Sequence, residues 1–290
     1  MVERLIDFRP VPQLSPSYSV GMSSPSTTLT VWAGSWLAGC SAPDDLLDAL
    51  RTWAPRQSVA AGDPVTGGHT GLPWAAHDET DAGPGAGIMV LLKLIREATA
   101  APGAELRLVL PVPGDVRGLP TGSEFAAAAT EAGEGLLLGA PGTLGTGLVP
   151  VWTEDEALRW TVYATPIPMT SEPDMPLGEA EYSMRQAVRD AADALMQLHT
   201  TGMDTGGIPP RDLIEAELEG HTRHAYPESM PLRARRILDS ADQVAAILTV
   251  AEREPASAPT SASAAAAQET LLRPLWNAIR AARLAAVHAR

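Results

Sequence analysis

Apolar residues recur at helical spacing through the last third of the chain. Met184, Val188, Ala191, Leu195 and Leu198 follow one another at steps of four and three residues, and the same spacing returns over 237–251 and 272–286. Such seams predict long helices that pack lengthwise at shallow angles. With a shorter helix expected near 210–218, this region is predicted to form a small antiparallel helical bundle.

The first part of the chain alternates between two kinds of pattern. Amphipathic spacing predicts helices over 27–37, 43–53, 88–95 and 125–132, with Ser41 and the capping box Thr121-Gly-Ser-Glu124 at two of their starts. Short β-rich runs predict strands over 58–60, 106–110, 135–138, 148–152 and 160–165. We interpret 106–110 as a central strand. The period-two alternation of 160–165 indicates a half-exposed antiparallel strand, and the last three runs fit a three-stranded meander.

These patterns predict an α+β fold in two domains. Residues 1–170 are expected to form a mixed or antiparallel sheet with helices, preceded by an extended arm over 1–25. Residues 171–290 are expected to form the helical bundle. The Gly-, Pro- and His-rich stretch 61–86 is interpreted as a long loop, and the Ala/Ser/Pro/Thr-rich stretch 254–268 as a flexible linker before the last helix.

The chain is strongly acidic, with a formal net charge of -14. Such a surface repels nucleic acid and anionic membranes, so neither is expected as a partner. Cys40 is the sole cysteine, which excludes an intramolecular disulfide and a Cys-rich zinc site. No signal peptide is recognisable, because the N-terminus lacks a basic region followed by an apolar stretch. No membrane span is expected, because no window approaches about 18 uninterrupted apolar residues. The expected location is the cytoplasm.

The most distinctive local feature is the loop 111–120, which joins the strand 106–110 to a capped helix start. Loops of this kind often bind ligands, because free N–H groups and the positive helix end point outward. Arg117 is a candidate for holding an anion and Asp115 for orienting a hydroxyl or a base, with Arg107 nearby. The alternative is a rigid connection in which Asp115 and Arg117 pair with each other or are solvated.

Other motifs point to no metal or cofactor. Gly83-Pro-Gly-Ala-Gly87 precedes a helix but lacks the Gly-Lys-Ser/Thr ending of a phosphate-binding loop. The glycines between 139 and 147 lie between two strands and indicate a hairpin turn. His221 and His224 have the spacing of two ligands on one helix face, but no third ligand is evident, so we expect no metal site.

The last helix differs from the rest of the chain, because it is basic. It carries Arg273, Arg280 and Arg283, with Trp276 in its apolar stripe. A basic amphipathic helix on a linker is able to dock a protein partner. The alternative is that it packs on the acidic bundle to which it is tethered. A homo-oligomer built through the bundle seams is a third interpretation.

Three stretches together resemble a conserved uncharacterised family of high-GC actinobacteria. They are 4–12 (Arg-Leu-Ile-Asp-Phe-Arg-Pro-Val-Pro), Leu106 through Pro120, and 236–249, and the resemblance covers nearly the whole chain. It implies no activity and no site residues. The leading hypothesis from sequence is therefore a non-catalytic interaction or regulatory protein that acts through its helical C-terminal part. The alternative is a small-molecule enzyme or sensor with its site at 111–120.

Overall fold

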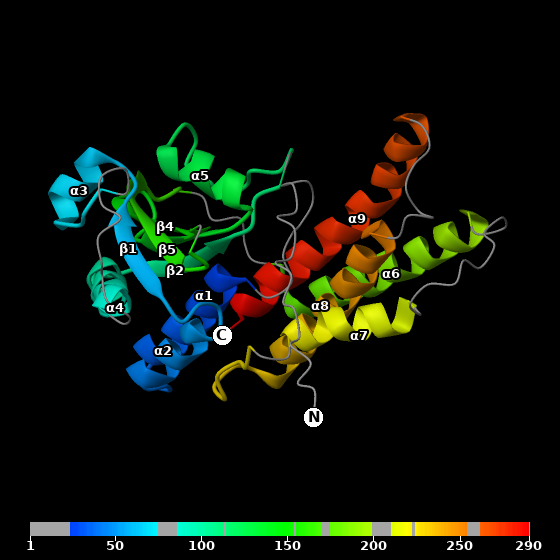
Figure 1. Cartoon of the computed structure of the whole chain (residues 1–290), viewed down its shortest axis with the longest axis horizontal. Coiled ribbons are helices and arrows are strands. Elements are labelled where there is room, and N and C mark those ends of the chain that lie inside the picture. Colours follow the sequence, from blue (N-terminus) through cyan, green and yellow to red (C-terminus); the bar gives the residue numbers. More distant parts are fainter. Residues whose placement is uncertain are drawn as a thin grey trace, which may run out of the picture.

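The fold has a sheet part and a helical part, which lie side by side in Figure 1. It is seen in a computed structural model that describes residues 24–74, 86–112, 114–153, 155–169, 175–198, 210–221, 224–253 and 262–289. A mixed sheet with its covering helices is followed by long helices along the chain, which confirms the predicted α+β class. The predicted arm over 1–25 lies outside the described residues as far as residue 23.

The sheet has the strand order β1-β5-β4-β3-β2. Strands β2 to β5 pair antiparallel with their neighbours, and β1 pairs parallel with β5 at the other edge. The predicted meander is therefore confirmed as β3-β4-β5, with a tight hairpin between β3 and β4. The strands are β1 Gln57–Ala61, β2 Glu105–Val109, β3 Gly135–Gly139, β4 Leu144–Trp152 and β5 Leu158–Pro166.

Two strand assignments from the sequence are wrong. Strand β2 lies at an edge of the sheet and not at its centre. Its sequence is as apolar as that of a central strand because the helical part covers part of its outer side, where His288 accepts from Leu108 N. Strand β5 is not half exposed, since Trp160 and Thr165 are both fully buried and Thr161 is 5% exposed. It pairs with β1 in parallel as well as with β4, so it is an interior strand covered on both faces.

Helices cover both faces of the sheet. Helices α1 (Pro25–Leu37), α2 (Pro43–Arg51) and α4 (Ala86–Ala98) bury their apolar side chains against one face, around Trp160. Helix α5 (Glu124–Ala132) packs through Phe125 on the other face. Helix α3 (Pro64–Thr70) lies in the stretch that we interpreted as loop. Its start is capped by the carboxylate of Asp63, which accepts from Thr66 N.

At two helix starts, the capping residue lies slightly later in the sequence than predicted. Helix α2 begins after Ala42, whose N–H donates to Asp45, while the hydroxyl of Ser41 lies against Ser35. Helix α5 is capped by Ser123 rather than by Thr121, because the Ser123 hydroxyl accepts from Ala126 N.

The helical part contains α6 (Leu177–Leu198), α7 (Pro210–His221), α8 (Leu232–Arg253) and α9 (Ala262–Val287). Arg233 at the start of α8 pairs with Glu181 near the start of α6, and α9 runs back in the opposite direction (Figure 1). Fully buried alanines, such as Ala241 and Ala282, line the seam where α9 packs on both neighbours. Helix α9 begins at Ala262, inside the predicted linker 254–268, and residues 254–261 of that linker lie outside the described residues.

The start of α1 is capped from a distance by Glu134, whose carboxylate accepts from Ser26 N at 2.8 Å. Desolvation raises the pKa of this carboxyl above its ordinary value. The group therefore contributes most to stability below its unfolded pKa, and that contribution is lost as the pH rises through the folded pKa.

The replacement Glu134→Gln is expected to remove this pH dependence, because the amide oxygen still accepts from Ser26 N and carries no charge. Denaturant unfolding of both proteins at about pH 5 and about pH 7.5 measures the difference in their free energies of unfolding. The natural protein should lose stability relative to the variant as the pH rises. A difference that stays constant would contradict this explanation.

Candidate functional site

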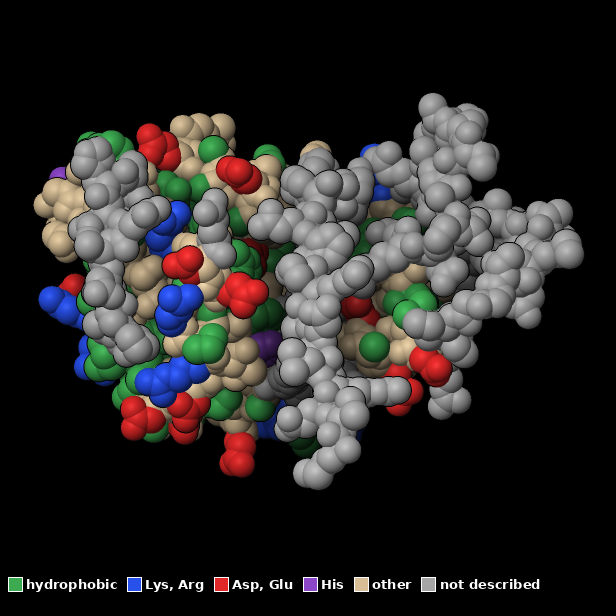
Figure 2. Space-filling model, in the orientation of Figure 1, with side chains coloured by type: hydrophobic (Ala, Val, Ile, Leu, Met, Phe, Trp, Pro, Cys, Tyr) green, Lys and Arg blue, Asp and Glu red, His purple; other side chains and the backbone are tan. Residues whose placement is uncertain are grey.

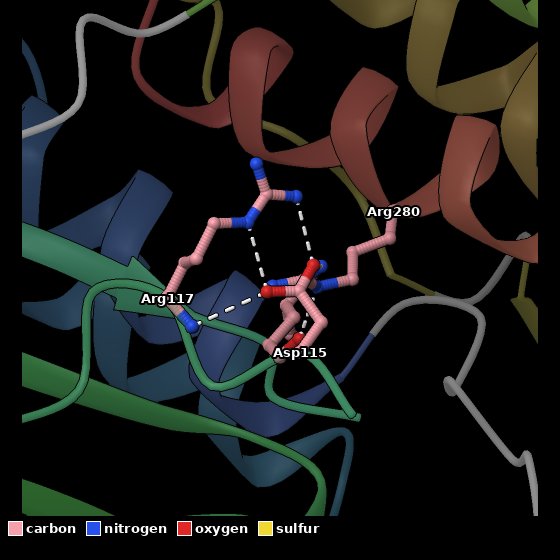
Figure 3. Close-up of polar contacts among 4 residues, drawn as sticks. Asp115, Arg117 and Arg280 are labelled. Atoms are coloured by element: carbon pink, nitrogen blue, oxygen red, sulfur yellow. Dashed lines mark hydrogen bonds and ion pairs between the residues drawn. The ribbon is translucent and has the colours of Figure 1, made fainter. Parts of the chain in front are cut away.

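Asp115 is held by two arginines from different parts of the fold (Figure 3). The guanidinium of Arg117 donates to both of its carboxylate oxygens, at 2.9 and 2.8 Å. Arg280 of α9 donates to the same carboxylate and to the carbonyl oxygen of Leu110. The hydrogen bonds from Arg117, followed by that from Arg280, hold the pKa of Asp115 well below its usual range. The ionised Asp115 thus ties α9 to the loop after β2.

Asp115 and Arg117 are the residues predicted to form a ligand site at 111–120. Asp115 and Arg117 are brought together, but their polar groups are used on each other and on Arg280, and neither residue lines the cavity described below. Arg107 is not part of the cluster. It lies on β2 with its guanidinium 3.7 Å from Glu105, and it lines that cavity.

The other residues singled out on the basic helix are largely turned inward. Arg283 is 1% exposed and donates to Asp242 of α8 at 2.8 Å. Trp276 is 5% exposed in the bundle core, whereas Arg273 is exposed. Docking of a separate protein through Trp276, Arg280 and Arg283 stays a prediction, and in this structure those side chains are engaged within the chain.

Helix α9 also closes part of the outer edge of β2. Leu108 N donates to Nε2 of His288 at 3.1 Å, directly after the helix, while Leu110 O accepts from Arg280. Unpaired strand edges are commonly covered in this way, because exposed N–H and C=O groups invite pairing with other chains.

A second set of contacts joins the loop before α8 to α1 and α2. The imidazole of His224 stacks on Trp53, with 3.8 Å between ring centroids and 13° between planes. Trp32 Nε1 donates to Ala225 O at 2.9 Å, and the hydroxyls of Ser35 and Ser229 lie 2.8 Å apart. The helical part is therefore fastened to the sheet part along two lines, one at this loop and one at α9.

A cavity of about 1010 Å³ lies between these two lines of attachment. We call it the junction cleft. Its walls come from α1 and the turn after it, from 104–107 at the start of β2, from Pro141, from 227–231 and from 287–289. Ligand sites favour such concave surfaces between structural units. The described residues of both parts contribute to it, so the cleft exists only in the docked arrangement.

Two small residues give the cleft an open wall. Cys40 is exposed at its rim, where Sγ donates to Ala38 O at 3.8 Å. Gly34 lies inside α1, and a Cβ built on it meets no atom within 4 Å. Glycine in a helix interior is unfavourable and usually has a packing or functional reason. No packing contact requires a glycine at position 34, so we infer that the missing side chain keeps this wall of the cleft open.

The replacement Gly34→Ala is expected to raise the free energy of unfolding by about 0.5–1 kcal/mol, because alanine favours the helix and its methyl group meets nothing. Urea unfolding of the two proteins measures the change. A loss of stability would mean that the space over Gly34 is filled in solution.

The glycine-rich motif 83–87 lies largely outside the described residues, and the histidine pair forms no site in the part of the chain that the structure describes. Helix α7 ends at His221, so His221 and His224 do not share a helix face, and His224 stacks on Trp53 instead. Among the described residues, no group of three or more His, Cys, Asp or Glu side chains is placed to hold a metal. None of the described helices is both long and apolar enough to cross a membrane.

Sequence reasoning missed the junction cleft because separate segments build it. The signal that was present is Gly34, a glycine in the middle of an otherwise good helix pattern. In Figure 2, acidic and basic side chains are interspersed over the coloured surface of the sheet part, and hydrophobic side chains are scattered among them.

These features define a two-part α+β protein with a cleft at the junction of its parts. The chain belongs to the Rv1486c-like family: the N-terminal domain model matches residues 26–175 and the C-terminal domain model matches residues 178–284. It is 40% identical to "Uncharacterized protein ML1804" of Mycobacterium leprae and 41% identical to "Uncharacterized protein Rv1486c" of Mycobacterium tuberculosis. Each comparison covers 92% of this chain and 97% of the relative. No solved structure matches.

Proposed function

We propose that this protein is a non-catalytic interaction or regulatory protein whose binding site is the junction cleft. The observation that carries the proposal is that both parts wall one cavity of about 1010 Å³. An occupant touching both parts would stabilise the docked arrangement over any separated one, which is how binding is converted into a regulatory signal. The helical part contributes through 227–231 and 287–289. The cytoplasmic location remains a prediction.

A binding role fits the polar groups of the cleft better than catalysis does. Nucleophilic catalysis by Cys40 needs an adjacent base to take its proton. His288 lines the same cleft, but its Nε2 already accepts from Leu108 N, and the thiol of Cys40 is directed to Ala38 O. The alternative enzyme site at 111–120 has Asp115 and Arg117 paired with each other and with Arg280.

The single cysteine provides a direct test. Cys40 lines the cleft and is exposed, so an occupant should slow its alkylation by iodoacetamide. The purified full chain is mixed with a whole extract of the organism that makes it, and the alkylation rate of Cys40 is measured. We expect slowing in the natural protein and much less in a Gly34→Leu variant, whose side chain projects from α1 into the cleft.

A matched control moves the thiol to a remote surface. In the double variant Cys40→Ser/Val65→Cys the cysteine lies on α3, where Val65 is 65% exposed. Its alkylation should be unaffected by the extract. The same rate for Cys40 with and without extract, over a full fractionation, would overturn the proposal.

A further inference from the structure

The outer edge of β2 is closed by α9 along only part of its length. Leu108 N and Leu110 O are taken by His288 and Arg280. Since outward-facing backbone groups recur every second residue in a strand, the N–H and C=O of Leu106 point to the same side. Within the described part of the chain, no hydrogen bond reaches these outward groups of Leu106.

The open stretch of edge faces the junction cleft. Residues 104–107 form one wall, and Gly34 of α1 forms part of another. Val31 and Met230, 9% and 7% exposed, give the lining apolar side chains. The cleft therefore combines a backbone donor and acceptor in β conformation, an apolar surface, and a helix position without a side chain.

We propose that the junction cleft binds an extended peptide segment of another protein, which pairs with β2 at Leu106 and places an apolar side chain against Val31 and Met230. This inference rests on the proposed function of the cleft and names its partner class. An unpaired strand step is recognised by another extended backbone, and alternate side chains of such a peptide enter flanking pockets. The cavity of about 1010 Å³ is at the upper end of the roughly 300–1,000 Å³ of ordinary ligand sites, enough for a short peptide.

The first measurement is amide hydrogen exchange in the free, full-length, ¹⁵N-labelled protein. Leu106 N–H should exchange at least ~10-fold faster than Arg107 and Leu108, which are bonded to β3 and to His288. Protection of Leu106 in the free protein would overturn the proposal, because the edge would then be filled by the chain itself. Protection that grows with protein concentration would overturn it in favour of a second copy.

The second measurement uses synthetic peptides selected from a phage-displayed library of random short peptides. Binding should protect Leu106 N–H. Methylation of one peptide nitrogen, which removes the N–H that donates to Leu106 O, should weaken binding by ~10-fold or more, while methylation of its sequence neighbours has a smaller effect. Gly34→Leu should weaken binding at least as much, whereas the matched control Gly34→Ala should retain affinity within about threefold.

The outcomes separate this inference from the proposed function. If the extract protects Cys40 after protease digestion as well as before it, and no selected peptide protects Leu106, the cleft binds a small molecule and the peptide proposal fails alone. If neither the extract nor any peptide affects Cys40, both proposals fail. Peptides that bind equally to the natural protein and to Gly34→Leu would also overturn the inference.

Discussion

Replacing Arg283 with methionine is expected to lower the free energy of unfolding by about 3–5 kcal/mol, the usual cost of breaking a buried ion pair from one side. Arg283 is 1% exposed and Asp242 is 8% exposed, and they lie in the alanine-lined seam between α8 and α9. Methionine restores much of the volume but leaves the Asp242 carboxylate without its guanidinium partner. Urea unfolding followed by circular dichroism measures the loss.

The double variant Asp242→Leu/Arg283→Met is the control. Because apolar residues often replace a buried ion pair without net cost, it should recover most of the lost stability. A single variant that loses less than about 1 kcal/mol, or a double variant no more stable than the single one, would show that the pair is hydrated in solution.

The replacement Arg280→Met is expected to cost about 2–3 kcal/mol, because it leaves Leu110 O without its donor and Asp115 with one arginine instead of two. The larger consequence concerns the junction, since Arg280 is one of the residues that fasten α9 to the sheet part. We expect the helical and sheet parts to lose cooperativity, with calorimetry showing a broadened or split unfolding transition.

The matched variant Arg117→Met removes the other partner of Asp115. The Arg117 side chain is 66% exposed and pairs with Asp115 of its own loop, so its loss should cost no more than about 1 kcal/mol and leave a single transition. Equal effects of the two variants would mean that Arg280 has no special role in the junction.

Local patterns in the sequence were sufficient to locate most helices and strands. The steps of three and four residues that located α6, α8 and α9 depend on one buried stripe per helix, which is a property of neighbouring residues. The meander was predictable for the same reason, because short strands separated by turn residues pair with their neighbours. Helix α3 was missed because Gly67 and Gly68 disfavour a helix, and the cap from Asp63 was overlooked.

The partners of a buried residue often come from distant parts of the chain, and these partners could not be predicted from local sequence patterns. The apolar run of β2 does not reveal that its outer side meets Arg280 and His288, which lie far along the chain. The positive charge of α9 suggested a surface for a partner. Its two inward arginines instead meet Asp115 and Asp242, and no local pattern announces either pairing.

The residues predicted for a site at 111–120 do not lie together in the junction cleft. Asp115 and Arg117 pair with each other, as the alternative of a rigid connection expected, and Arg280 of the basic last helix joins them. Arg107 lines the junction cleft, although it was predicted as a neighbour of the 111–120 loop. The cleft itself depends on how the two parts dock, so it became visible only in the folded chain.

The central claim is that the two parts are docked in one fixed arrangement that forms the junction cleft. The most direct test attaches spin labels to the native Cys40 and to a cysteine at Ile247, which is 41% exposed on α8, and measures the distance between them by pulsed electron paramagnetic resonance. We expect one narrow distance distribution, which broadens in Arg280→Met. A broad or two-peaked distribution in the otherwise unaltered protein would contradict it.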